Sequence, residues 1–180
     1  KTWRDLRDRR LLPFDAEKLT RVELTAKGSP VELGKNNSNA WAILKPRPLR
    51  ADNFAVEELV RKLKDARLEV VNDTEEEAAI PGQFAAAAPV GVAKVTDAKG
   101  TMQLEIRKGK DNAYFAKSSA VEGVFKTSPE LGDGVAKGLD DLRNKKLFEF
   151  GFNQPERVEV KQDGTAYTFT KAGTEWKKDG

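Results

Sequence analysis

The stretch Asp5-Leu6-Arg7-Asp8-Arg9-Arg10-Leu11-Leu12-Pro13-Phe14 decides how this chain is organised, because it occurs twice. It returns as Asp141-Leu142-Arg143-Asn144-Lys145-Lys146-Leu147-Phe148-Glu149-Phe150. A gapless alignment of 5–35 with 141–171 has ten identical positions out of 31, and one further gap pairs Trp41 with Trp176. This spacing is far longer than the repeat unit of a solenoid. We therefore expect a duplicated module whose second copy is cut off at Gly180.

The composition excludes several classes of chemistry. The chain has no histidine and no cysteine, which removes disulfides, the usual zinc, copper and iron sites, and Ser-His-Asp or Cys-His catalysis. We therefore expect no cofactor and no metal. The 32 basic and 29 acidic residues are interleaved along the chain, and nucleic-acid binding would need a clustered basic face instead.

Hydrophobic periodicity predicts an α+β fold with antiparallel β-hairpins, a β-meander and a few helices. Asp52 is a candidate N-cap, and the apolar spacing that follows predicts a helix over 53–66. We also expect a strand at 68–71, one short helical turn at 74–77, and a helix that starts at Ser128-Pro129. The connections between the strands of 90–125 are too short for parallel crossovers.

The pattern along the chain predicts three segments. Residues 1–84 form an N-terminal hairpin and helix lobe, 85–140 form a β-meander lobe, and 141–180 begin the second, truncated repeat. The boundary between the first two is placed in the proline- and alanine-rich run at 80–90.

The repeat makes a prediction about strand register. Residues 19–44 and 155–178 should form the same hairpin, with Gly28 and Gly164 in matching turns, followed by a strand that carries a tryptophan. The alternating apolar residues should bury the same side in both copies. Because no counterpart of 53–66 follows in this sequence, the second sheet must lean on the meander or stay partly exposed.

Several of these elements together resemble a bacterial domain family of unknown function, the one numbered forty-three forty. They are Trp3 to Asp15, Arg21-Val22-Glu23-Leu24, Trp41 with Lys45-Pro46, and Ala113-Tyr114-Phe115-Ala116-Lys117 before Val124-Phe125. The resemblance implies a membrane-anchored protein with one N-terminal transmembrane helix and repeated extracytoplasmic modules, often encoded beside gliding-motility-type ABC transporter subunits. It brings no catalytic residues. The chain starts at Lys1, so we expect the anchor upstream of it.

The candidate contact residues are Trp41, Trp176, Arg21, Glu23 and Tyr114. The tryptophans are candidates for an aromatic platform, although a packing role in the core is the stronger interpretation. Arg21 and Glu23 share one face of a strand and are candidates for a ligand clamp or an ordinary exposed ion pair. Arg4, Arg7, Arg9 and Arg10 are candidates for lipid head-group contacts, against the simpler interpretation of a solvated connector.

The function expected from these observations is a non-enzymatic extracytoplasmic binding or scaffold module, accessory to an ABC-type transport or gliding-motility-type complex. The expected partners are subunits of that membrane complex, and membrane contact runs only through the removed anchor. The alternative is a carbohydrate-binding or carbohydrate-active domain that uses Trp, Tyr and carboxylates.

Overall fold

The computed structural model describes residues 8–26, 28–148, 150 and 154–179. The chain forms two compact units, residues 1–144 (unit 1) and 145–180 (unit 2). Arg4 and Arg7, two of the four arginines considered for lipid head-group contacts, lie outside the described residues. The predicted boundary at 84/85 falls inside a helix, and the sheet of unit 1 continues across it.

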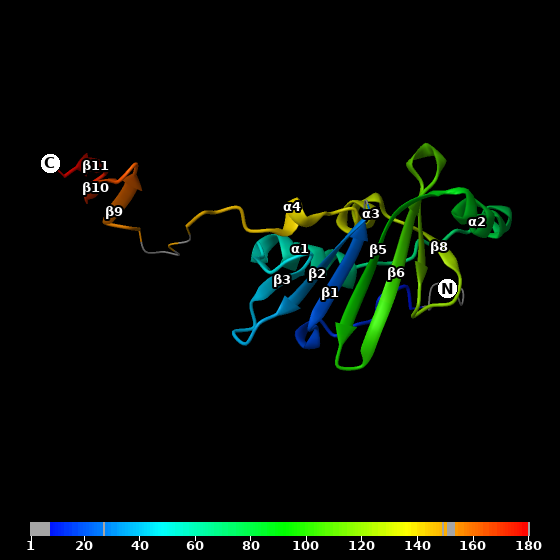
Figure 1. Ribbon diagram of the computed structural model, residues 1–180. Coiled ribbons are helices and arrows are strands. Elements are labelled where there is room, and N and C mark those ends of the chain that lie inside the picture. Colours follow the sequence, from blue (N-terminus) through cyan, green and yellow to red (C-terminus); the bar gives the residue numbers. More distant parts are fainter. Residues whose placement is uncertain (1–7, 27, 149, 151–153, 180) are drawn as a thin grey trace. The chain divides into compact units, whose positions relative to one another are not determined.

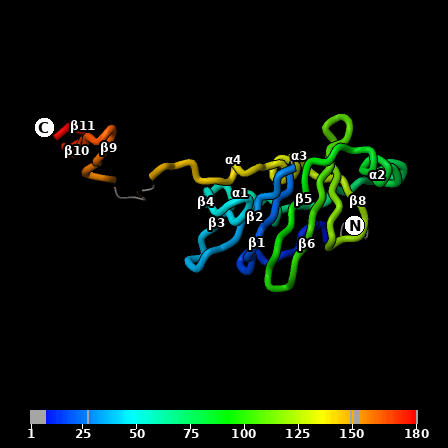
Figure 2. Tube along the Cα trace, in the orientation of Figure 1, coloured from blue at the N-terminus to red at the C-terminus, as the bar shows by residue number. Residues whose placement is uncertain are grey.

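Unit 1 is built on an eight-stranded antiparallel sheet with the order β4-β3-β2-β1-β5-β6-β7-β8 (Figures 1 and 2). Strands β1 and β5 are neighbours in the middle, so the two halves of the chain extend the sheet in opposite directions. This confirms the α+β class with antiparallel hairpins and a meander. The strands are β1 (Arg21–Ala26), β2 (Ser29–Lys35), β3 (Trp41–Lys45), β4 (Leu49–Arg50), β5 (Ala88–Asp97), β6 (Gly100–Lys108), β7 (Tyr114–Ser118) and β8 (Val124–Thr127).

Helices cover both faces of this sheet, but at different places. Helix α1 (Asn53–Lys64) and the short helices α3 (Pro129–Val135) and α4 (Leu139–Leu142) contribute to the main core. We call the sheet face that this core covers the inner face. Helix α2 (Thr74–Ala86) covers the outer face beside β7 and β8 (Figure 1). Strand β7 shows the division, since Ala116 joins the main core while its neighbour Phe115 joins the α2 cluster.

Helix α1 begins and packs as the sequence predicts. The Asp52 carboxylate accepts a hydrogen bond from the Ala55 amide at 3.1 Å, which satisfies one of the free donors at the helix start. Val56, Leu59 and Leu63 recur at helical spacing and are fully buried. The helix ends at Lys64, two residues before the predicted end.

The packing of a distant side chain explains why α3 has a glycine at position 132, and the sequence alone does not reveal this contact. A Cβ atom on Gly132 would lie 2.2 Å from Cε1 of Tyr114. The ring therefore occupies the space that any larger residue would need, and the helix accepts the conformational cost of glycine at this position.

Two expectations about 68–87 are wrong. Residues 68–71 form no strand, although the Leu68 amide donates to Arg9 O and the Glu69 amide donates to Lys126 O, both at 2.9 Å. Residues 74–77 are the first turn of the 13-residue α2, which continues through Pro81. Ile80 and Phe84 bury against Phe115, and this tertiary contact offsets the cost of Pro81 and Gly82 within the helix.

Unit 2 is a three-stranded antiparallel sheet with the order β11-β10-β9. Its strands are β9 (Arg157–Gln162), β10 (Thr165–Ala172) and β11 (Glu175–Lys178). The register matches that of β1–β3. Arg21 pairs with Gly34 and Lys35 with Trp41 in unit 1, and the counterparts Arg157 with Thr170 and Lys171 with Trp176 pair in unit 2.

The turns of the two hairpins also match, since Gly28 and Gly164 both have φ of 79°. The predicted register is thus confirmed, while the common origin of the two segments stays a prediction. The prediction that both copies bury the same side is wrong for unit 2, where Val160 is 45% and Trp176 is 43% exposed, whereas the stated alternative of a partly exposed second sheet is confirmed. The described part of unit 2 contains three strands and no helix that would cover them.

Candidate functional site

The most prominent candidate site lies beside α2, on the outer face of the unit 1 sheet. The Asp73 carboxylate caps the helix by accepting hydrogen bonds from the Glu75 and Glu76 amides at 2.8 and 3.2 Å. Buried Ile80 and Phe84 hold the other side of the helix against Phe115. These contacts fix the remaining face of α2, which carries small residues, next to the turn that follows β6.

Between this helix face and the turn lies an open pocket of about 800 Å³, here called the α2 pocket. Its volume is in the range of small-molecule and peptide side-chain sites. Two residues of the turn, Asp111 and Asn112, have φ of 55° and 58°, a left-handed conformation that these residue types tolerate. The pocket is lined by Ala79, Gly82, Gln83, Ala86, Ala87, Gly109, Lys110, Asp111, Ala113, Phe115 and Lys126.

The lining is a small-residue floor with few polar groups at its rim. Its charged side chains are Lys110, Lys126 and one carboxylate, Asp111. Lys126 forms an ion pair with Glu76 of α2, which ties the helix to β8. A glycosidase site needs two carboxyl groups across the reacting bond, and this lining supplies one. The arrangement is suited to holding an apolar group next to a polar or anionic one.

Arg107 of β6 supports the wall of this pocket. Its guanidinium lies 4.5 Å from the ring centroid of Phe84, in cation–π geometry. Its Nε donates a hydrogen bond to Glu105 Oε1 at 2.7 Å. Arg107 therefore connects the α2 cluster to the charged outer face of the sheet.

A second polar cluster lies on the outer face around Glu32, whose side chain is only 8% exposed. Lys45 Nζ lies 2.7 Å and Arg21 Nη1 3.2 Å from its carboxylate oxygens. The hydrogen bond from Lys45 and the charge of Arg21 lower the pKa of Glu32, against the opposing effect of burial. Glu32 in turn raises the pKa of Lys45. The two cations compensate the charge of the buried carboxylate, and the cluster is best explained as a structural ion-pair network.

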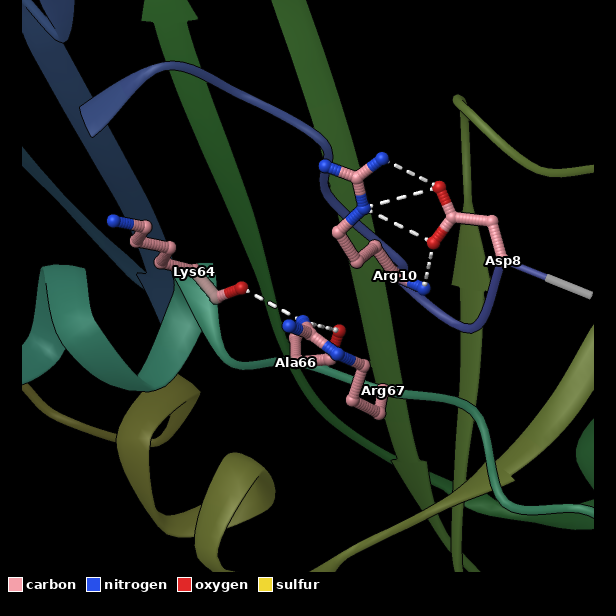
Figure 3. Close-up of polar contacts among 5 residues, drawn as sticks. All are labelled: Asp8, Arg10, Lys64, Ala66 and Arg67. Carbon is pink, nitrogen blue, oxygen red and sulfur yellow. Dashed lines mark hydrogen bonds and ion pairs between the residues drawn. The ribbon is translucent and has the colours of Figure 1, made fainter.

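Residues 8–14, here called the leader, run beside the chain that follows α1 (Figure 3). The residues after α1 also line a smaller pocket of about 320 Å³. The backbone of the leader pairs with the chain after the helix, with Leu11 N donating to Ala66 O at 3.0 Å. Arg67 donates to the carbonyls of Lys64 and Ala66 at 2.9 and 3.1 Å. Arg10 lies 2.6 Å from Asp8 in an ion pair that lowers the pKa of that carboxyl to about 2. For Arg10, this favours the connector interpretation over lipid contact.

The five sequence-predicted contact residues do not converge. Trp41 is 7% exposed, lies in the main core, and has Lys35 Nζ 5.4 Å from its ring centroid. Tyr114 packs on Gly132 at the inner face. Arg21 and Glu23 lie on the outer face, where Glu23 stands opposite Glu32 and Lys94. Trp176 lies in unit 2.

Sequence reasoning missed the α2 pocket because the alanine-rich run was interpreted as a junction. A signal was present. Ala79, Gly82, Gln83 and Ala86 follow one another at i, i+3, i+4 and i+7, which places them on one helix face.

The comparisons with known proteins identify a family. A family model described as "Domain of unknown function (DUF4340)" matches residues 41–180. The chain belongs to this family. The DUF4340 match begins at Trp41, so it includes α1, α2 and all of unit 2, while the leader and the β1–β2 hairpin lie before it. No curated protein and no solved structure matched the chain.

The described residues of this DUF4340 chain contain no group of three or more acidic, histidine or cysteine side chains placed to hold a metal ion. Among the same residues, no helix has the length and apolar character needed to cross a membrane.

Proposed function

We propose that this DUF4340 chain is a non-enzymatic extracytoplasmic binding or scaffold module of a membrane-anchored protein, accessory to an ABC-type transport or gliding-motility-type complex. The α2 pocket carries the binding part of the proposal. It is a large, open, small-residue surface on a well-anchored helix, with lysines at its rim. Its lining residues include no Ser, Thr or Cys nucleophile and only one carboxylate.

The location and the partner rest on the resemblance to the family. The expected occupant of the α2 pocket is an apolar side chain of a complex subunit, flanked by a carboxylate that faces Lys110. Such an occupant would use the small lining residues for close packing and the lysines for orientation.

Site-specific photo-crosslinking in cells that carry the membrane-anchored, full-length protein tests this proposal. A benzophenone amino acid at Ala86, which lines the pocket, should crosslink to a subunit of the transport complex. The matched control is the same amino acid at Ala85, which is exposed on the same helix but does not line the pocket. Equal crosslinking at both positions, or none at Ala86, would contradict the proposal.

The rival hypothesis, a carbohydrate-binding domain, draws on the exposure of Trp176. It predicts that oligosaccharides shift the Trp176 and Tyr114 resonances of the full chain at millimolar concentration. The binding-module proposal predicts no such shift.

A further inference from the structure

Unit 2 presents an apolar sheet face that no helix among its described residues covers, with Lys178 Nζ 4.9 Å from the ring centroid of Tyr167 on the same side. Residues directly opposite each other in an antiparallel sheet point to the same side. Val158 pairs with Phe169, and Val160 pairs with Tyr167. Trp176 lies opposite Lys171, two residues beyond Phe169, so it points to the same side as well. We call these five apolar side chains the unit 2 face.

Unit 1 shows what covers this arrangement of side chains. The counterparts in β1–β3 are Val22, Leu24, Val31, Leu33 and Trp41, and none is more than 7% exposed. They share one core with Val56, Leu59 and Leu63 of α1, which are fully buried. A helix with aliphatic residues at i, i+3 and i+7 is therefore a demonstrated cover for a sheet of this register.

The connector before unit 2 carries a second exposed apolar set. Leu147, Phe148 and Phe150 are 88%, 73% and 51% exposed. Their counterparts are Leu11, Leu12 and Phe14 at 0%, 1% and 7%.

In unit 1 the chain that follows α1 holds this leader in place. Leu11 N donates to Ala66 O at 3.0 Å, and Leu68 N donates to Arg9 O at 2.9 Å. One continuous segment, 51–68, thus contributes α1 to the core over the sheet face, together with α3 and α4, and also pairs with the leader.

We propose that the unit 2 face, together with Leu147, Phe148 and Phe150, forms one docking surface for an amphipathic polypeptide segment of the 49–68 type. The segment consists of a helix with Val or Leu at i, i+3 and i+7 and a short extended stretch after it. This is the helix-in-groove mode of recognition. A second unit 2 packed face to face would cover the sheet but has no element in the position that holds the leader. The proposal does not depend on the α2 pocket.

A peptide with the sequence of residues 49–68, titrated into the isotope-labelled 180-residue chain, tests the proposal by nuclear magnetic resonance. The expected result is saturable binding that shifts the amides of Val158 and Val160 and the indole of Trp176, with the β1–β3 amides unchanged. A control peptide with Leu59→Asp and Leu63→Asp should bind at least ten-fold more weakly, because burial of these leucines provides the affinity.

Two chain variants localise the binding. Val160→Glu places a charge on the unit 2 face and should weaken peptide binding at least ten-fold. Ala166→Glu places the same charge on the opposite face of the same sheet and should leave binding unchanged. If Val160→Glu loses the cross-strand contacts of β9 and β10, Trp176→Gln at the edge strand serves instead, with the same expected weakening.

Three results would overturn the proposal. The first is equal binding of the two peptides. The second is a set of shifts confined to β1–β3, which would mean that the peptide exchanges with α1. The third is a concentration-dependent shift of the unit 2 face without peptide, which would make a second copy of the chain the occupant.

Discussion

Strands β1–β3 and β9–β11 share one register and one turn geometry, yet the first set is buried and the second is largely exposed. Leu33 has no exposed surface, whereas its counterpart Phe169 is half-buried. The shared features are local, because alternation and the turn glycine determine which residues pair. Burial is not local, because it depends on α1, which lies 18 residues beyond β2 in unit 1. The residues that determine how the strands pair are thus different from the residues that determine whether the sheet is covered.

The largest expected effect comes from truncating matched core positions in the two units. Leu33→Ala should reduce the free energy of unfolding of unit 1 by about 2–5 kcal/mol, because it removes a fully buried side chain and leaves a cavity. Phe169→Ala should cost unit 2 about 1 kcal/mol or less, because its side chain loses little burial. Urea unfolding followed by resolved amide resonances of each unit measures both values. Similar losses in the two units would show that unit 2 has a covered core.

A smaller effect is expected at the matched turns. Gly28 and Gly164 have the same positive φ, and a Cβ at either position would meet no atom within 4 Å. Gly28→Ala and Gly164→Ala should therefore each cost about 1–2 kcal/mol, from backbone strain alone. The control is Gly82→Ala in α2, where space is also open but φ is helical, and where alanine should stabilise by up to about 1 kcal/mol. Unequal costs at the two turns would break the equivalence of the hairpins.

Features with local causes were predictable from the sequence. The Asp52 cap, the apolar spacing of α1 and the repeated hairpin each depend on residues that are close together in the sequence. The alternation of Val22 and Leu24 and its echo at Val158 and Val160 was enough to predict register in both units.

Features that depend on distant contacts were not predictable. Helix α2 passes through Pro81 because Ile80 and Phe84 meet Phe115, about 30 residues later in the chain. The α2 pocket depends on that packing and on the turn after β6, so no single stretch encodes it. The exposure of Val160 also has no local cause, since the same alternation in β1 is fully buried.

The smallest expected effect concerns acid stability, where the two units differ at the position of Glu32. Glu32 carries the ion pairs with Lys45 and Arg21, and its counterpart is Thr168, which does not titrate. The pKa of Glu32 is lowered in the folded state. Its contribution to stability is therefore present above the ordinary pKa of a glutamate and is lost as the pH falls through the lowered value. Because both cations are largely exposed, the contribution should be about 1 kcal/mol.

In urea unfolding between pH 6 and pH 3, Glu32→Gln should remove this part of the acid dependence of unit 1 and leave unit 2 unchanged. Lys45→Gln should have a larger effect on the acid limb than Arg21→Gln, because the Lys45 hydrogen bond is the main cause of the lowered pKa. An acid limb identical in Glu32→Gln and the parent chain would assign the acid sensitivity of unit 1 to other carboxylates, such as Asp97, whose pKa is lowered by backbone hydrogen bonds from Asp15 and Lys99.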